Sequence, residues 1–204
     1  TLDPGVRGNF RSLVAGDFDG DGVLDVAAAF SSAEYHVLPG GVAVLLGDGL
    51  GGFVRKPEVH VGTLLTGAAA ADFNGDGTVD LVLAEEFDAS VAVLLGDGFG
   101  GFAKREDVRA GRLPFVMATA DFDGDGTPDV AVTDLAGYHV PGGVTVLRGD
   151  GAGGFEKLPQ VRVGGYPCSI AAGDIDGDGV PDLAVLNRNW PPTFAGTLTI
   201  LHGD

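Results

Sequence analysis

A nine-residue acidic segment occurs four times in this chain of 204 residues, and it constrains the fold more than any other feature. Each copy has Asp at positions 1, 5 and 9, Asp or Asn at position 3, and Gly at positions 4 and 6. The copies begin at Asp17, Asp72, Asp121 and Asp174. Carboxylates gathered this closely repel one another unless a cation neutralises them. The sequence therefore predicts a repeated structural unit with a cation-binding loop in each repeat.

Calcium is the cation that suits these loops, because it takes about six to eight oxygen ligands and tolerates irregular geometry. The two glycines allow the backbone to fold tightly at positive φ, and the carbonyl of the seventh residue is placed to add a ligand. The predicted ligands of the four Ca²⁺ ions are Asp17, Asp19, Asp21, Val23 and Asp25; Asp72, Asn74, Asp76, Thr78 and Asp80; Asp121, Asp123, Asp125, Thr127 and Asp129; and Asp174, Asp176, Asp178, Val180 and Asp182.

Two other interpretations of these segments are weaker. An ordinary acidic turn is also rich in Asp and Gly, but it does not explain four copies of one pattern. The EF-hand loop needs a bidentate Glu at its last position and a flanking helix. At that position the chain has Ala28, Leu83, Val132 and Val185, and a strand-like apolar run follows each loop.

The residues around each loop predict four short strands per repeat. The loops are spaced by 55, 49 and 53 residues. A run of small residues precedes each loop, an apolar run follows it, and a third run such as 42–46 ends in a Gly-Asp-Gly turn suited to a hairpin. A more polar fourth strand passes through Val59, Val108 and Val161. Four strands in about fifty residues is the size of a propeller blade. We expect an all-β fold, a β-propeller with four blades of four antiparallel strands.

The two ends of the chain predict how the ring is closed. The segment Pro4-Gly5-Val6 resembles Pro57-Glu58-Val59 in the fourth strand of the first repeat. We therefore expect the N-terminal segment to complete the last blade and cover its open edge. On this interpretation residues 1–204 form a single domain. The alternatives are a fragment of a larger propeller, or two chains that share one ring.

The repeat resembles the FG-GAP/VCBS-type repeat of integrin α-chain propellers and of many bacterial surface and secreted proteins. The Asp-x-[Asp/Asn]-Gly-Asp-Gly-x-x-Asp loop carries most of this resemblance, together with Gly52-Phe53, Gly101-Phe102 and Gly154-Phe155. The resemblance implies that each loop binds one Ca²⁺. The Gly-Ala-Pro part of the family pattern is missing, and family propellers usually have seven blades.

Composition and charge exclude several functions. The net charge of −17 disfavours binding to nucleic acid and to anionic membranes, and no apolar run is long enough to be inserted in a membrane. Cys168 is the single cysteine, so no internal disulfide forms. Loops of this kind in extracellular modules bind calcium weakly, at about 10⁻⁴–10⁻³ M. A calcium-rich, secreted or cell-surface location follows.

The loops opposite the calcium face are the expected ligand surface, for a protein or a glycan. Tyr35-His36 and Tyr138-His139 repeat between the first and third blades, and Trp190 adds a large aromatic ring. These residues either pack locally or form a recognition site. Glu85 and Glu86 are expected to be solvated. Without a nucleophile or zinc motif, we expect a non-catalytic binding, adhesion or self-assembly module. The alternative is a carbohydrate-binding lectin or an enzyme with its site on that face.

Overall fold

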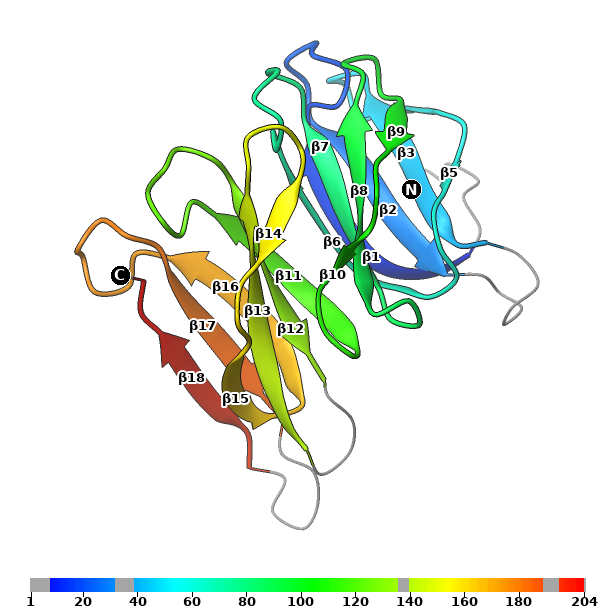
Figure 1. Cartoon of the computed structure of the whole chain (residues 1–204). Helices are drawn as coiled ribbons and strands as arrows, with labels where there is room; N and C mark the ends of the chain where they lie inside the picture. The colour runs from blue at the N-terminus through cyan, green and yellow to red at the C-terminus, as the bar shows by residue number, and fades with distance from the viewer. Residues whose placement is uncertain (1–7, 32–38, 136–139, 189–194, 204) are drawn as a thin grey trace.

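The computed structural model describes residues 8–31, 39–135, 140–188 and 195–203. These residues form eighteen β-strands and no helix, so nothing in the described ranges is a helix that could cross a membrane. The strands make four antiparallel sheets that lie around a ring as the blades of a β-propeller (Figure 1). The predicted fold class, an all-β propeller with four blades, is confirmed.

The first three blades follow the same order, from an inner strand to an outer strand made of two short pieces, and the described part of the fourth blade has the first three strands of this order. The first blade contains β1 (Asn9–Gly16), β2 (Asp25–Ser31), β3 (Gly41–Gly47), β4 (Phe53–Arg55) and β5 (Val59–His60). The second contains β6 (Leu65–Ala71), β7 (Asp80–Glu85), β8 (Ser90–Gly96), β9 (Phe102–Lys104) and β10 (Val108–Arg109). The third contains β11 (Pro114–Ala120), β12 (Asp129–Asp134), β13 (Pro141–Gly149), β14 (Phe155–Lys157) and β15 (Val161–Gly165). The fourth contains β16 (Pro167–Gly173), β17 (Asp182–Asn187) and β18 (Thr197–Leu201).

The second and third strands of the inner blades are apolar on both sides. Every residue of β7 is buried, and so are the first five residues of β8. A strand that is covered on both faces has no polar side to present, so its sequence is a continuous apolar run rather than an alternation. The runs Leu81–Ala84 and Val91–Leu95 have this composition because a neighbouring blade packs on each face.

The outer strand is interrupted by a bulge. In the first blade Leu45 pairs with Arg55 while Val42 pairs with Val59, so the outer strand has one residue more than β3 over this distance. An extra residue bends the strand and breaks the ladder locally. The predicted fourth strands through Val59, Val108 and Val161 are therefore present, as β5, β10 and β15, but each is separate from the piece that follows the turn.

Three hydrophobic clusters hold the blades together, one between each pair of successive blades in the described part of the chain. The inner strands β1, β6, β11 and β16 contact one another in that order. Within the described ranges β18 pairs only with β17. The predicted closing strand at residues 4–6 lies outside the described residues.

Candidate metal centres

The four acidic loops connect the first strand of each blade to the second, at one end of the propeller. The loop 17–25 joins β1 to β2, and the loops 72–80, 121–129 and 174–182 occupy the same place in the other blades. Gly20 and Gly22 have φ of 76° and 84°, and the matching glycines of the other loops have φ between 71° and 93°. The predicted positive φ is thereby confirmed at these positions.

The first aspartate of each loop is held by backbone N–H groups. The N–H of Gly20 donates to Asp17 Oδ1 at 2.8 Å, and that of Gly22 donates to Asp17 Oδ2 at 2.9 Å. Equivalent bonds hold Asp72 and Asp174, and one from Gly126 holds Asp121. The left-handed glycines turn these N–H groups inward, so the carboxylate is fixed in orientation before any ligand arrives.

The ninth residue joins the loop to the third strand. Asp25 is buried, and its Oδ2 accepts the Phe18 N–H at 2.8 Å while its Oδ1 accepts the Gly47 N–H at 2.7 Å. Asp80, Asp129 and Asp182 accept the same pair of bonds in the other blades. This aspartate therefore has a structural role whether or not it binds an ion, since each oxygen keeps a further lone pair.

Carboxylate oxygens converge in three of the loops. Ligand atoms of positions 1, 3 and 9 lie within 4.8 Å of one another in the first and third loops, which places Asp17, Asp19 and Asp25 together. In the fourth loop the converging groups are Asp174, Asp176 and Asp178. The second loop has Asn74 at position 3, an amide oxygen that also suits calcium.

The fifth residue of each loop bonds to the loop backbone, as Asp21 does in the first loop. Asp21 is not among the converging groups there, and its Oδ1 accepts the Val23 N–H at 2.7 Å. Asp76, Asp125 and Asp178 accept the N–H two residues on in the same way. The fifth aspartate thus shapes the loop backbone. Ligation by it, and by the carbonyls of Val23, Thr78, Thr127 and Val180, stays a prediction.

The electrostatics of the loops favour a bound cation. Burial raises the pKa of Asp80 and of Asp129, against the opposing effect of the N–H groups that bond to them. Burial also raises the pKa of Asp19, where the neighbouring carboxylates act in the same direction. A metal ion would reverse these effects by stabilising the charged carboxylates. The donor set of loops one to three is all oxygen, and it fits Ca²⁺.

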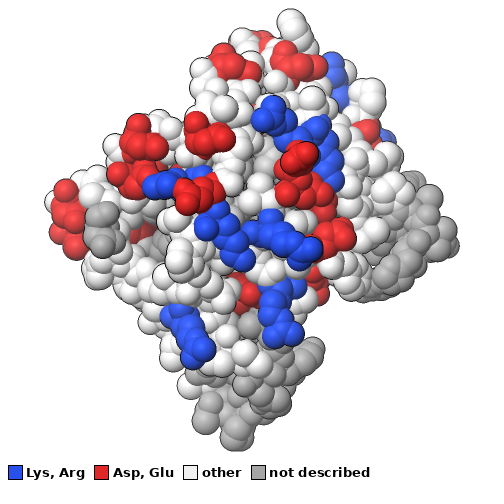
Figure 2. All heavy atoms as spheres, viewed as in Figure 1, with Lys and Arg blue, Asp and Glu red and all other residues white. Residues whose placement is uncertain are grey.

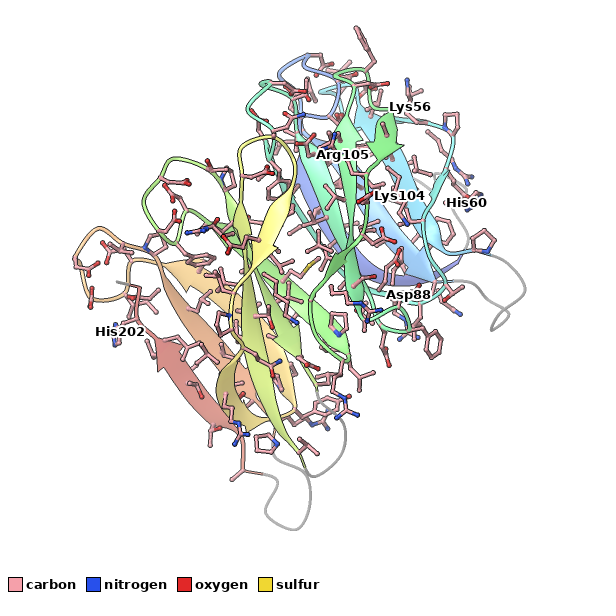
Figure 3. The ribbon with its side chains drawn as sticks, in the orientation of Figure 1. Lys56, His60, Asp88, Lys104, Arg105 and His202 are labelled. Atoms are coloured by element: carbon pink, nitrogen blue, oxygen red, sulfur yellow. The ribbon has the colours of Figure 1, made fainter. Side chains whose placement is uncertain are left out.

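Two basic side chains approach the third and fourth loops. Arg148 Nη1 lies 3.8 Å from Asp123 Oδ2. His202 Nδ1 lies 3.3 Å from Asp176 Oδ2 and also 3.3 Å from Asp182 Oδ1, at the edge of the fourth blade (Figure 3). In the fourth blade the N–H of Ile175 lowers the pKa of Asp182. The sequence analysis did not identify His202. It could have been found from its position directly after the third strand of the fourth blade, which ends beside the acidic loop.

One aromatic contact connects each of the first two loops to the next blade. The ring of Phe102 packs on Phe18 with centroids 5.7 Å apart, and Phe155 packs on Phe73 at 5.4 Å. The Gly100 N–H donates to the Phe18 carbonyl at 2.9 Å, and the Gly153 N–H to the Phe73 carbonyl at 3.1 Å. The loop of one blade and the Gly-Phe turn of the next are therefore one structural unit.

At the third interface a cavity occupies the corresponding place. It has a volume of about 280 Å³ and is lined by Phe122, Asp129, Leu183 and His202, among others. In the two preceding interfaces the turn phenylalanine fills this space.

The Gly-Asp-Gly turns are closed by their aspartates, which sequence reasoning did not single out. Asp48 Oδ1 accepts the N–H groups of Leu50 at 2.8 Å and Gly52 at 2.7 Å, and these bonds lower its pKa. Asp97 and Asp150 do the same in the next two blades. These aspartates could have been identified from the sequence, because Asp occupies the same position in all three turns, three residues before a Gly-Gly pair.

The predicted ligand residues of the opposite face, Tyr35, His36, Tyr138, His139 and Trp190, lie outside the described residues. The prediction that Glu85 is solvated is wrong. Glu85 is the last residue of β7, and it is only 2% exposed. Its Oε1 accepts no hydrogen bond within the described structure. Lys104 Nζ, on the outer strand of the same blade (Figure 3), lies 3.9 Å from Glu85 Oε1. Burial raises the Glu85 pKa to about 7, and Lys104 opposes this while Asp107 and Asp88 add to it.

Basic side chains gather on the outer strands of the second and third blades. Figure 2 shows Lys and Arg across the middle of this face, with acidic side chains among them and further acidic side chains toward its loop-bearing margin. Two shallow cavities there are lined by Lys104, Arg105 and Arg109, and by Arg109, Arg112, Lys157 and Arg162. We call these six residues the basic strip. Glu106, Asp107, Asp150 and Asp134 line the same two cavities, so the strip gathers basic side chains among acidic ones on a chain with a net charge of −17.

The blades and their acidic loops define the class of protein: a β-propeller whose repeats each carry an Asp-rich loop between the first two strands. A model of the FG-GAP-like repeat matches residues 17–83, 72–132 and 133–185. These segments cover well over half of the chain, so the chain belongs to the FG-GAP-like repeat family. A search of the curated proteins finds no match.

Solved structures with a similar fold are distant in sequence. Rhamnogalacturonan lyase YesW is 14% identical with a TM-score of 0.58, and the similarity covers 88% of this chain and 41% of that one. The V. cholerae biofilm matrix protein Bap1 is 18% identical with a TM-score of 0.49, covering 97% of this chain and 38% of that one. The chain thus spans less than half the length of either protein. At these identities the first likeness shows the fold alone.

Proposed function

We propose that this chain is a calcium-stabilised β-propeller that acts as a non-catalytic binding, adhesion or assembly module outside the cell. The observation that carries the proposal is the construction of the loops. Backbone N–H groups orient the first and ninth aspartates, and oxygens of positions 1, 3 and 9 converge in the first and third loops. Such an arrangement concentrates negative charge in one place, and a divalent cation stabilises it.

The residues that would hold Ca²⁺ are the predicted ligands at positions 1, 3, 5, 7 and 9 of each loop. Positions 1, 3 and 9 converge in the first and third loops, and positions 1, 3 and 5 converge in the fourth. Bound calcium would supply charge neutralisation and cross-linking of the loop. Because the ninth aspartate already bonds to the third strand through Gly47 or its equivalents, an ion on the same side chain would connect the loop to the blade. The carboxylates are therefore used to hold the fold.

The expected effect on stability follows from linkage. At free calcium ten times the dissociation constant, a site that binds only the folded chain adds about 1.4 kcal/mol. Four such sites would add about 5–6 kcal/mol, which is comparable to the whole stability of a typical domain. A module of this kind is folded and rigid where calcium is abundant, which supports a secreted or cell-surface location.

Native mass spectrometry tests the metal proposal directly. In millimolar calcium the chain is expected to carry four Ca²⁺ ions. The variants Asp17→Asn and Asp121→Asn should each lose one ion, because each removes charge from a carboxylate that converges with two others. Asp107→Asn is the matched control, since Asp107 lies outside the loops and pairs with Lys104. A wild-type chain without bound metal, or equal counts in all four proteins, would contradict the proposal.

The basic strip favours a second candidate function, binding of an acidic polysaccharide. Lys157 and Arg162 line a shallow cavity together with Arg109, and positive side chains attract an anionic chain whose binding weakens with salt. Affinity for a polyuronate is then expected to fall in a Lys157→Glu/Arg162→Glu variant. It should stay unchanged in Arg11→Glu, a basic residue of β1 outside the strip.

The same binding assay also tests the loops opposite the calcium face as the glycan-binding surface. If the sugar instead stacks on the predicted aromatic residues, Trp190→Ala or Tyr138→Ala abolishes binding and the basic-strip variant does not. Binding that none of these substitutions changes would exclude both glycan surfaces and leave the protein-binding or assembly role.

A further inference from the structure

The side chain at the end of the third strand differs in the fourth blade. In the first three blades this residue is Leu46, Leu95 and Arg148, and in the fourth it is His202. Leu46 and Leu95 pack against the hydrophobic clusters between the blades. A neutral imidazole, unlike a leucine or an arginine, has a nitrogen lone pair that can bind a metal ion. The fourth blade therefore brings a nitrogen ligand to its acidic loop.

His202 lies together with two carboxylates of that loop. Its Nδ1 is 3.3 Å from Asp176 Oδ2 and 3.3 Å from Asp182 Oδ1, at the edge of the fourth blade (Figure 3). The ligand atoms of the three residues all lie within 4.8 Å of one another. Among the converging groups in the described residues, this is the one that includes a histidine. The set has a nitrogen and two oxygens, unlike the all-oxygen sets of the first and third loops.

The spacing of these atoms suits a metal ion better than an ion pair. A charge-assisted hydrogen bond from an imidazolium to a carboxylate is about 2.7–2.9 Å long, and both distances from His202 are longer. One Nδ1 proton also serves only one of two equidistant oxygens well. In a tetrahedral zinc site with bonds of about 2.0–2.1 Å, neighbouring ligand atoms lie about 3.3–3.4 Å apart. The two distances from Nδ1 agree with this geometry.

Backbone N–H groups orient both carboxylates. Asp182 is buried and accepts the Ile175 N–H at 2.8 Å and the Gly203 N–H at 3.0 Å. The Asp178 N–H donates to Asp176 Oδ1 at 3.2 Å, while Oδ2 of the same carboxylate lies on the side of His202. Bonds of this kind hold metal ligands in position. Because the side chains of Asp176 and His202 are exposed, water can complete the coordination of an ion.

The third blade shows that this position reaches the loop in the interior of the propeller as well. Arg148 Nη1 lies 3.8 Å from Asp123 Oδ2, in a blade that is followed by another. The contact with the third residue of the loop therefore belongs to the position in the blade. Arginine supplies a fixed positive charge there, whereas histidine supplies a ligand.

We propose that the fourth loop is a site for a divalent transition metal of the zinc class, bound by His202, Asp176 and Asp182. Calcium takes oxygen ligands, whereas imidazole suits zinc, copper, iron and nickel. Three protein ligands with a position open to water are typical of an accessible zinc site. Asp176 also converges with Asp174 and Asp178, so the loop offers an all-oxygen set and a mixed set that share one carboxylate. The site does not depend on calcium binding by the other loops.

Isothermal titration calorimetry with zinc chloride, in buffer that contains millimolar calcium, tests the site. The wild-type chain is expected to bind one Zn²⁺. Losing a residue that only orients a ligand costs about 10–100-fold in metal affinity, so His202→Ala and Asp176→Asn should each weaken zinc binding by about tenfold or more. His60→Ala is the matched control, since His60 is an exposed histidine on β5 of the first blade (Figure 3). Circular dichroism shows whether each variant is folded.

Native mass spectrometry in calcium alone separates this site from the calcium proposal. His202→Ala should carry as many Ca²⁺ ions as the wild type, because imidazole is not a calcium ligand, whereas Asp176→Asn should carry one fewer. A wild-type chain that takes up no zinc, zinc binding that His202→Ala leaves unchanged, or a folded His202→Ala chain that loses calcium would each overturn the inference. A chain that binds zinc through His202 but carries no calcium would support this site and contradict the proposed function.

Discussion

The buried carboxyl of Glu85 gives a quantitative prediction. Its pKa in the folded chain is about 7 against an ordinary value of 4.5, chiefly because of burial. A carboxyl group whose pKa is raised on folding contributes stability that is fully present below its unfolded-state pKa, and this stability is lost as the pH rises through the folded-state pKa. The free energy of unfolding should therefore fall by about 3 kcal/mol between pH 4 and pH 8 through this group alone.

The variant Glu85→Gln isolates this effect, because a neutral amide of the same shape has no proton to lose. Near pH 4 its free energy of unfolding should be close to that of the wild-type chain. At pH 8 it should exceed the wild-type value by about 3 kcal/mol, a figure that already includes the attraction between Lys104 and the charged carboxylate. Urea unfolding at both pH values measures the difference.

The loops also titrate, but they do so equally in both proteins, so only the difference between variants at each pH is used. Glu86→Gln is the matched control, on the adjacent half-buried residue, and it reports the effect of removing one negative charge. If the difference between Glu85→Gln and the wild type is the same at pH 4 and pH 8, the reasoning from burial is refuted.

Two further predictions concern packing and loop geometry. Phe73→Ala should lower the free energy of unfolding by about 3–5 kcal/mol, because the ring is fully buried against Phe155, while the exposed Phe99→Ala should change it by less than about 0.5 kcal/mol; equal effects in chemical denaturation would contradict the inter-blade contact. Gly22→Ala should lower the free energy of unfolding by about 1–2 kcal/mol, because φ is 84° at Gly22 while a Cβ there would meet nothing within 4 Å. Gly173 has the same open space without the positive φ, so Gly173→Ala should leave the free energy of unfolding nearly unchanged. A neutral Gly22→Ala in chemical denaturation would show that the loop backbone relaxes.

Much of the fold could be predicted from the sequence because the repeat reports the same local structure several times. The runs after each loop, such as Leu81–Ala84, are continuous and apolar, and this pattern indicates strands covered on both faces. The Gly-Asp-Gly turns indicate hairpins, and the turn phenylalanines Phe102 and Phe155 occur at a fixed distance from them. Repetition separates these signals from chance.

The parts that could not be predicted depend on contacts between residues far apart in the chain. Glu85 resembles a surface acid in sequence, and only the packing of its blade shows that it is buried. Asp134 accepts N–H groups of Arg112 and Leu113 and so fixes the connection between two blades, which its strand-like surroundings do not indicate. The role of Asp21 in accepting the Val23 N–H also depends on loop geometry rather than on residue type.

The melting temperature of the chain in calcium and in excess chelator tests the central claim most directly. If four loops bind the ion only in the folded state, removing calcium should cost about 5–6 kcal/mol. For a chain of 204 residues this corresponds to a fall of roughly 10–20 °C in Tm. Magnesium at the same concentration should restore little of it, since it demands a smaller and more regular site. An identical melting curve in calcium and in chelator would contradict the account.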